Sequence, residues 1–476
     1  MTFTISTGLW THQREMVDFA KDRLRNVGYC WWVAGCAVGK TLASLQTAKE
    51  LGVRKMLVLT TKAAITSAWE IDIAQHTEGL ECVALTKGNS TAKIARMQEA
   101  LLSKEPVCVV VNYETARIMA DKLGSFTGFQ MVVADESHKL QAHNSQLSNK
   151  LALACERITY RLEMTGTPWD DRPLQVFGQV RFLKPWRCDR SVQSHILGYW
   201  GDFFDEYTRY YVQDDLKIPY GYKNLERLNR IINPFTVHVD SEEVLSLPPE
   251  IDLVRYVDMK GELKRLYETF EKDMIAYLGK DVLIADNRLV LSLRLHQLTG
   301  GFYQPYDKTE PIKEIPHISA LAKVHALLEI LDEIGGKPTV VFTRFKTDVQ
   351  RIQQELAAKK IETKLLVGGL HQHVEWQAGA GQVLIANISA GAAGINLSRA
   401  RYCVYYSTGH SNVEYNQSRY RVRRPTSDAS LPITYYHIVM RKSIDVEIRA
   451  ALQSKGEVAN CLLKSLEHRV KSSKNG

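Results

Sequence analysis

Trp32-Val-Ala-Gly-Cys-Ala-Val-Gly-Lys40-Thr41 is the stretch of sequence that decides the fold of this chain. It begins inside an apolar run over residues 29–33 that we predict to be a buried β-strand, and it leads into a helical pattern over residues 41–51. A loop of small residues between a strand and a helix presents backbone N–H groups to a phosphate at the positive end of the helix. An ordinary strand-to-helix turn also favours small residues, so the loop alone is consistent with both interpretations.

The last part of this stretch, Gly39-Lys40-Thr41, matches the P-loop consensus, whereas Ala34 occupies the position of its first glycine. In a P-loop, Lys40 places a positive charge on the phosphates of the nucleotide, and the Thr41 hydroxyl holds Mg²⁺. The other residues that we expect around the phosphates are Gly35, Cys36, Ala37, Val38 and Gly39.

The composition is that of a globular protein with room for two or three domains, because 45% of the 476 residues are hydrophobic and 24% are charged. Lys and Arg number 61 against 53 Asp and Glu, a basic excess that suits a polyanionic partner without requiring one. The eight cysteines form no C-x-x-C pair or Cys/His cluster, which is typical of reduced thiols rather than of a zinc site. No apolar run reaches the ~18 residues of a membrane helix and no signal-peptide pattern is present, so we expect a cytoplasmic or nucleoid-associated protein that is not secreted.

Short apolar runs alternate with helical segments from the P-loop to about residue 168. Their nearly continuous apolar character predicts a parallel sheet covered by helices on both faces, the doubly wound α/β arrangement that collects ligands at the carboxyl ends of its strands. The predicted strands after the first are residues 56–60, 83–85, 107–111, 131–134 and 160–164.

Two acids, Asp135 and Glu136, directly follow one of these predicted strands. Behind a P-loop, Asp135 would hold the water shell of Mg²⁺ and Glu136 would orient and deprotonate the attacking water. An acidic pair after a strand is also a common helix start. Thr165-Gly-Thr-Pro168 ends a further strand, and its hydroxyls either couple the nucleotide site to a neighbouring lobe or belong to a plain turn.

Other polar residues lie at strand ends or at a helix start in this lobe. Gln13 opens an amphipathic helix and has the paired donor and acceptor that read an adenine edge, although a solvated helix start is equally consistent. Residues 60–62 and 112–115 are polar strand ends that suit contact with a phosphate backbone or are simply solvated loops.

Residues from about 170 to 318 change character, and we predict helical protrusions and a linker there, with Leu247-Pro-Pro249 as a break. Aromatic residues are dense over residues 199–211. Interleaved with Arg and Lys they suit base stacking, but so apolar a cluster favours a core.

A second α/β pattern without a P-loop begins near Ser319, with predicted strands over residues 339–342, 363–366, 383–385, 402–406 and 433–439. Ser389 opens a glycine-broken loop after one of these strands. Four arginines then occur within six residues in a helical context. At their spacing, Arg421 and Arg424 lie on one side of a helix and reach across a cleft to the γ-phosphate; a solvated or nucleic-acid-binding face is the alternative.

Taken in order, these stretches resemble the superfamily 2 helicase-type motors, and specifically the Swi/Snf family of double-stranded DNA translocases. Ala37 departs from the glycine that this family usually has. The resemblance covers nearly the whole chain, and the residues that carry it are Gln13 and the ranges 34–41, 60–69, 135–138, 165–168, 339–345, 389–397 and 417–424.

The resemblance implies two RecA-like doubly wound parallel-sheet lobes, residues 1–185 and 319–476, with helical protrusions and a linker between them over residues 186–318. It implies ATP and Mg²⁺ as cofactors, with Lys40, Glu136, Arg421 and Arg424 catalytic and Thr41 and Asp135 at the metal. Gln13, Gly394 and Asn396 are further implied nucleotide contacts. The implied nucleic-acid contacts are Thr61, Lys62, Trp69, Asn112, Tyr113, Arg344 and Ser389.

The activity that follows is a DNA-stimulated ATPase that moves on duplex or branched DNA with little sequence preference, in fork remodelling, branch migration or annealing. We expect a monomer. Two other interpretations stay open on the sequence alone: an RNA-directed helicase, and a nucleotide-dependent switch or scaffold that does not translocate.

Overall fold

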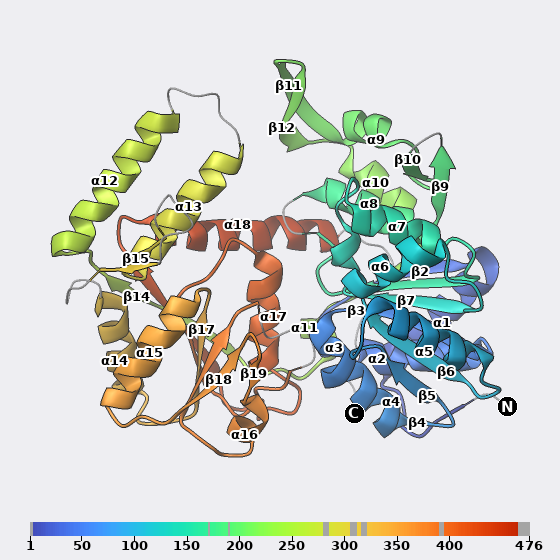
Figure 1. Cartoon of the computed structure of the whole chain (residues 1–476), viewed down its shortest axis with the longest axis horizontal. Helices are drawn as coiled ribbons and strands as arrows, with labels where there is room; N and C mark the ends of the chain where they lie inside the picture. The colour runs from blue at the N-terminus through green and yellow to red at the C-terminus, as the bar shows by residue number, and fades with distance from the viewer. Residues whose placement is uncertain are drawn as a thin grey trace. The chain divides into compact units, whose positions relative to one another are not determined.

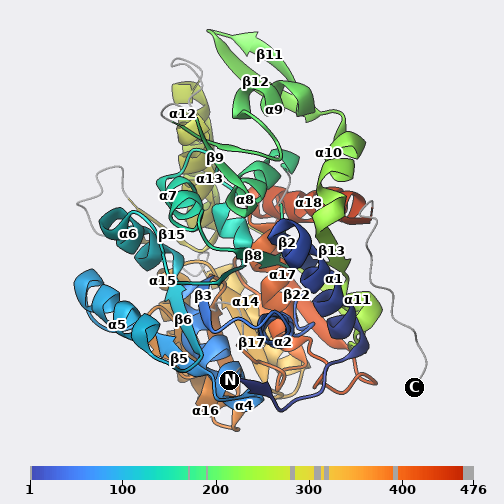
Figure 2. The same ribbon diagram turned by 90° about the vertical axis from the view of Figure 1, so that its right-hand side faces the viewer.

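The computed structural model describes residues 3–169, 172–188, 191–278, 285–304, 312–315, 321–389 and 395–464. The chain divides into two compact units, and the main division falls between Ser246 and Leu247, at the break expected from Leu247-Pro-Pro249. Among the described residues after this break, Ile395 and residues 456–464 group with the first unit. Each unit contains one seven-stranded sheet wrapped by helices (Figure 1, Figure 2). The two-lobed α/β fold predicted from the sequence is confirmed.

The sheet of the first unit is parallel throughout, because every neighbouring pair of strands runs in the same direction. Its strand interiors are buried on both faces, as their apolar composition predicts. In spatial order the strands are β13 (Thr236–Val239), β2 (Tyr29–Ala34), β8 (Tyr160–Thr165), β7 (Met131–Asp135), β3 (Lys55–Thr60), β6 (Val107–Asn112) and β5 (Glu81–Ala84).

Alternate side chains of each strand enter cores on opposite faces of this sheet, which is what a doubly wound lobe requires. In β2, Trp32 belongs to one buried cluster and Trp31 to another. The helices of this unit are α1 (Thr11–Val27), α2 (Lys40–Glu50), α3 (Lys62–Ala64), α4 (Glu70–His76), α5 (Ser90–Leu102), α6 (Tyr113–Leu123), α7 (Gln146–Ala154), α8 (Val176–Leu183), α9 (Trp200–Tyr207), α10 (Leu225–Ile232) and α11 (Ser241–Val244). Short pairs of strands, β1 (Thr4–Ile5) with β4 (Thr77–Glu78) and β9 (Pro185–Cys188) with β10 (Ser191–Ser194), complete the unit.

The expectation of helix across the aromatic stretch is wrong for its second half. Residues after α9 form a hairpin of β11 (Thr208–Gln213) and β12 (Leu216–Tyr222) that extends away from the sheet (Figure 1). Its turn residues Asp214 and Asp215 both have positive φ, 49° and 60°, the geometry of a type I′ turn that matches the twist of paired strands. Phe203 is buried in the core, as predicted for the cluster, whereas Tyr211 is 51% exposed.

The sheet of the second unit is parallel except for its last, short strand. Its strands in spatial order are β14 (Glu250–Val257), β22 (Ile433–Met440), β21 (Tyr402–Tyr405), β17 (Thr339–Thr343), β20 (Val383–Asn387), β18 (Thr363–Val367) and β19 (Leu370–His371). Its helices are α12 (Gly261–Leu278), α13 (Ala285–Thr299), α14 (Ala322–Glu333), α15 (Lys346–Ala358), α16 (His373–Gln377), α17 (Asn412–Val422) and α18 (Ile444–Lys464), and β15 (Phe302–Tyr303) pairs with β16 (Lys313–Glu314).

Sequence patterns missed one edge strand of the first sheet, β13, and both edge strands of the second, β14 and β19. β13 and β14 both come from the segment interpreted as protrusions and linker, and each joins a sheet edge in parallel. β14 includes exposed charged residues such as Glu250 and Asp252, because only one of its long edges pairs with the sheet, and therefore it lacks an apolar run. Among the described helices, none has the length and apolar character to cross a membrane.

Candidate nucleotide-binding site

The P-loop wraps tightly between the end of β2 and the start of α2. Two of its residues have left-handed backbone, Ala37 at φ 63° and Gly39 at φ 77°. Gly39 is favoured by its positive φ and also by lack of space, since a Cβ there would lie 2.0 Å from Nε2 of Gln13. Gly35 is similarly confined, because its Cβ would lie 2.1 Å from Oγ of Ser241. Glycine at these two positions therefore lets the loop pack closely against Gln13 and Ser241.

Lys40, the first residue of α2, folds back over this loop. Its ammonium donates to the carbonyl oxygens of Ala34 and Gly35 at 3.0 and 2.8 Å. Neither carbonyl is a charged partner, so the positive charge of Lys40 is available to an anion within the loop. Thr41 follows in the first turn of the same helix and is half-buried.

Gln13 contacts the P-loop from α1. Its side-chain Nε2 donates to the carbonyl oxygens of Val38 and Gly39 at 3.2 and 3.4 Å, and its Oε1 accepts from the backbone N–H of Trp10 at 2.9 Å. A ring nitrogen of His12 also lies 3.0 Å from the Val38 carbonyl. The start of α1 thus supports the outer side of the loop, and the adenine contact of Gln13 stays a prediction.

Asp135 and Glu136 lie at the carboxyl end of β7 and are both buried. Oδ2 of Asp135 accepts hydrogen bonds from Oγ1 of Thr60 at 2.8 Å and from Nε1 of Trp69 at 3.0 Å. Glu136 has left-handed backbone with φ 55°, a strained conformation for a residue with a Cβ. Its Oε2 is enclosed and has no hydrogen-bond partner among the described residues.

The two carboxyl groups have opposite pKa shifts. Burial, together with the neighbouring charge of Glu136, raises the pKa of Asp135 to about 6. Burial acts on Glu136 too, but His138, 3.3 Å from its Oε2, and Lys40 favour the carboxylate and hold its pKa below the ordinary value. Glu136 therefore loses its proton more readily than Asp135.

The residues of the P-loop and the acidic pair are suited to bind a nucleotide with Mg²⁺. The P-loop offers backbone donors and the Lys40 ammonium, and Oε2 of Glu136, beside Nδ1 of His138, is enclosed without a hydrogen bond among the described residues. Carboxylate and hydroxyl oxygens, here those of Asp135 and Thr41, are ligands that Mg²⁺ prefers. Strand β8 also contributes to the site, since Oγ1 of Thr165 at its end lies 3.2 Å from Nδ1 of His138.

The structure corrects two predicted nucleic-acid contacts in this unit. Trp69 is 0% exposed and Tyr113 is 5% exposed, because both side chains point inward to Asp135 rather than to solvent. The Tyr113 hydroxyl donates to the backbone carbonyl of Asp135 at 2.8 Å. Thr61, Lys62 and Asn112 are at least partly accessible, and their contacts with DNA stay predictions.

The second unit carries the remaining predicted contacts. Arg344 is half-buried, with its guanidinium 3.1 Å from Nδ1 of His296. Ser389 binds Oδ1 of Asn387 through its backbone N–H and its hydroxyl, at 3.0 and 2.6 Å. Asn396 is exposed, and its Oδ1 accepts from the Ser398 backbone at 3.0 Å. Gly394 lies outside the described residues.

The placement of Arg421 and Arg424 on one face of a helix is wrong. Arg421 is buried in the last turn of α17, but the helix ends at Val422 and Arg424 lies beyond it. The physical reason is Pro425, which disfavours helical backbone in the residue before it. If the two arginines act together on a phosphate, Arg421 does so from the last turn of α17 and Arg424 from the segment that follows the helix.

Sequence analysis did not assign a role to Arg419 of the same helix. Its guanidinium donates to both carboxylate oxygens of Asp252 at 2.8 Å, lies 3.0 Å from Glu250 and stacks 3.9 Å from the ring centre of Tyr435. These partners fix α17 to β14 and β22. The arginine run was visible in the sequence, but its acidic partners are more than 160 residues away along the chain.

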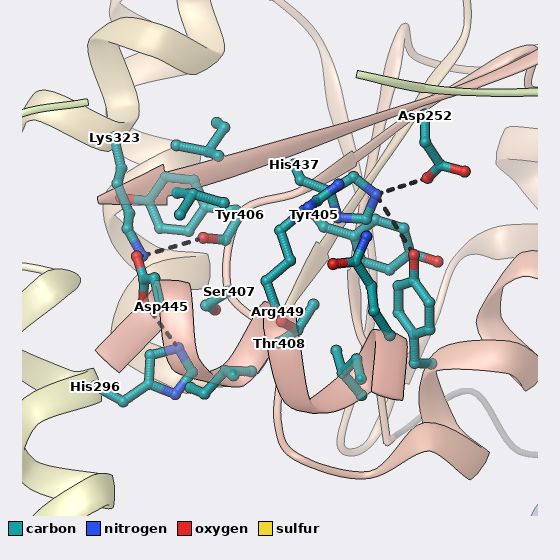
Figure 3. A pocket seen from close by; sticks show the side chains of 16 residues that line it. Asp252, His296, Lys323, Tyr405, Tyr406, Ser407, Thr408, His437, Asp445 and Arg449 are labelled. Atoms are coloured by element: carbon teal, nitrogen blue, oxygen red, sulfur yellow. Dashed lines mark hydrogen bonds and ion pairs between the residues drawn. The ribbon is translucent and has the colours of Figure 1, made fainter. Parts of the chain in front are cut away.

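A cavity of about 190 Å³ lies between α17, α18 and the sheet of the second unit (Figure 3). Two of its acidic groups, Asp445 and Asp252, are paired at its two ends. At one end, Lys323 lies 2.6 Å from Asp445, which is 3.7 Å from His296; at the other, His437 lies 2.8 Å from Asp252. The carboxylates of this cavity are thus compensated within the unit.

Comparison with known proteins agrees with this geometry. A family model described as the SNF2-related domain matches residues 12–299, and one described as the helicase conserved C-terminal domain matches residues 322–426. Protein p41 of Acyrthosiphon pisum secondary endosymbiont phage 1 is 23% identical over 92% of this chain and 94% of its own length. The ATP-dependent DNA helicase DDM1 of Arabidopsis thaliana is 20% identical over 82% of this chain and 53% of its own.

A third relative is the DNA annealing helicase and endonuclease ZRANB3 of Mus musculus, 21% identical over 99% of this chain and 42% of its own length. The chain therefore spans about half or less of the two curated helicases named here, but nearly all of the phage protein. The first family model alone matches more than half of the chain. The family predicted from the motifs is confirmed: the chain belongs to the SNF2-related family of helicase-type ATPases.

Proposed function

We propose that this protein is an ATP-driven motor that moves along duplex or branched DNA. The observation that carries the proposal is the match of both lobes to the SNF2-related and helicase C-terminal families, in a chain whose first lobe has the Gly39-Lys40-Thr41 part of a P-loop and the acidic pair Asp135-Glu136. DDM1 is named a DNA helicase and ZRANB3 a DNA annealing helicase, which supports DNA as the partner. Fork remodelling, branch migration or annealing is the role that we infer.

In the proposed mechanism, the backbone of the P-loop and Lys40 bind the phosphates, and Thr41 with Asp135 holds the metal. Mg²⁺ supplies charge neutralisation at the phosphates. Glu136 orients the attacking water and accepts its proton on Oε2, the enclosed oxygen without a hydrogen-bond partner among the described residues. Arg421 and Arg424 reach the same phosphates only when the two units close, so hydrolysis depends on closure.

DNA enters this cycle by favouring the closed form, which makes ATP turnover DNA-stimulated. Thr61, Lys62, Asn112, Arg344 and Ser389 are the residues that we propose for phosphate contacts. Such contacts carry little sequence information and weaken steeply with salt.

The test is an ATPase assay with single-stranded, duplex, forked and four-way-junction DNA, with RNA as comparator. We expect duplex or branched DNA to raise turnover many-fold. Stronger stimulation by RNA would support an RNA-directed helicase instead, and no stimulation by any nucleic acid would reject the motor proposal in favour of a switch or scaffold.

A further inference from the structure

Asp135 is held by three hydrogen bonds from other segments of the first unit. Thr60 and Trp69 donate to Oδ2 of its carboxylate, and the Tyr113 hydroxyl donates to its backbone carbonyl. All three donors are buried, Thr60 and Trp69 with no exposed surface and Tyr113 with 5%. Because both side-chain bonds end on Oδ2, the other carboxylate oxygen remains for a metal and its water shell.

Two of these donors are adjacent in the chain to residues that we propose for DNA contact, since Thr60 directly precedes Thr61 and Tyr113 directly follows Asn112. Trp69 lies seven residues after Lys62, at the end of a π-helical turn that connects α3 to α4. Two stretches of the chain, residues 60–69 and 112–113, therefore link accessible polar residues to buried donors on Asp135.

The backbone between Lys62 and Trp69 is unusual. Residues Ile65–Trp69 form a π-helix, in which the N–H of Glu70 bonds to the carbonyl of Ile65 rather than to that of Thr66. The extra residue in the turn changes the direction of the side chains that follow, and here the indole N–H of Trp69 meets Asp135. Lys62, at the other end of the segment, is exposed.

We propose that Trp69 is a positioning residue that transmits DNA contact at residues 61–62 to the metal-holding carboxylate of Asp135, with Tyr113 providing a parallel link from Asn112. The inference rests on the proposed function, since it names how DNA regulates the same site. A movement of the Lys62–Trp69 segment on DNA rotates the Asp135 carboxylate, because the indole N–H and the carboxylate move together.

The experiment compares Trp69→Phe with Trp31→Phe. Both changes replace a fully buried indole by a phenyl ring, but Nε1 of Trp31 has no hydrogen-bond partner among the described residues, whereas Nε1 of Trp69 bonds Asp135. The pair thus separates the loss of one hydrogen bond from the loss of indole volume. Melting temperatures of both variants without nucleotide report whether they fold.

The first readout is ADP affinity with and without Mg²⁺, measured by calorimetry. We expect Trp69→Phe to lower the Mg²⁺-dependent gain in affinity by about tenfold, the value of a lost hydrogen bond to a charged group, and to leave Mg²⁺-free binding unchanged. Trp31→Phe should keep the full gain. An unchanged gain in folded Trp69→Phe would overturn the proposal.

The second readout is the ratio of ATP turnover with and without duplex DNA, together with DNA affinity in the absence of nucleotide. We expect Trp69→Phe to bind DNA normally, since Lys62 is untouched, but to lose most of the stimulation. A stimulation ratio equal to that of Trp31→Phe would contradict the link. If the unsubstituted protein itself shows no stimulation, the proposed function fails, and the Mg²⁺ readout still decides whether Trp69 positions Asp135.

Discussion

The carboxyl edges of the two sheets differ in how they hold their acidic groups. In the first unit, two adjacent acids, Asp135 and Glu136, are buried at the edge, and Glu136 has left-handed backbone. In the second unit, Asp445 follows the end of β22 and pairs with the buried ammonium of Lys323 at 2.6 Å. The first edge therefore places two carboxyl groups side by side, whereas Asp445 at the second has a cation of its own unit as partner.

This difference indicates a division of labour. Strained backbone and unpaired buried groups cost free energy, and they persist where a ligand uses them. A compensated cluster instead makes a firm support, here for α17, whose last turn holds Arg421. Under the proposed function, the first unit would carry out the chemistry, and the pairs in the second would support the helix that holds Arg421.

The largest expected effect comes from the buried carboxylate of Glu136 at the first edge. Glu136→Gln removes the proton acceptor but keeps the side-chain volume, so we expect ATP turnover to fall by on the order of 10⁴-fold. Nucleotide binding should persist, as measured by calorimetry with ADP and Mg²⁺. Turnover close to that of the unsubstituted protein would remove Glu136 from the proposed mechanism.

Arg421→Ala tests whether an arginine of the second unit takes part in ATP hydrolysis at the P-loop of the first. We expect turnover to fall by on the order of 10³-fold with ATP affinity nearly unchanged, because an arginine finger acts on the transition state. Steady-state kinetics distinguishes a loss of turnover from a loss of ATP affinity. Lower ATP affinity with normal turnover at saturation would contradict the assignment.

Lys323→Met tests whether the ion pair of Lys323 with Asp445 stabilises the second unit. Lys323 is 1% exposed and pairs with buried Asp445, so its loss leaves an uncompensated carboxylate and should lower the free energy of unfolding by about 3 kcal/mol. Urea denaturation measures the change. The double variant Lys323→Met/Asp445→Asn should recover much of it, and Lys346→Met, at an exposed position, is the control.

The smallest expected effect concerns the strain of the first edge. Ala37→Gly should raise the free energy of unfolding by about 1 kcal/mol, since glycine adopts a positive φ without steric cost. Ala34→Gly, at a strand end without positive φ, should instead be destabilising. If thermal unfolding shows that both substitutions change the stability in the same direction, backbone strain at Ala37 does not affect the stability of the protein.

The sequence by itself determined the two parallel sheets and the position of the nucleotide site. Strand interiors such as residues 107–111 are apolar on both faces, and their β-branched composition favours a buried strand. The P-loop and the acidic pair Asp135-Glu136 were also readable, because their chemistry lies within a few adjacent residues. Even the strand ends were predicted to within a few residues.

Only the tertiary structure decided which side chains support that chemistry. It turned Trp69 and Tyr113 from predicted DNA contacts into partners of Asp135, placed Arg424 beyond the end of α17, and joined Arg419 to Asp252. The physical reason is that a polar residue in an apolar or arginine-rich stretch gives the same local pattern whether it faces solvent or a buried partner. The partner comes from a distant segment, and packing of the sheet brings the two together.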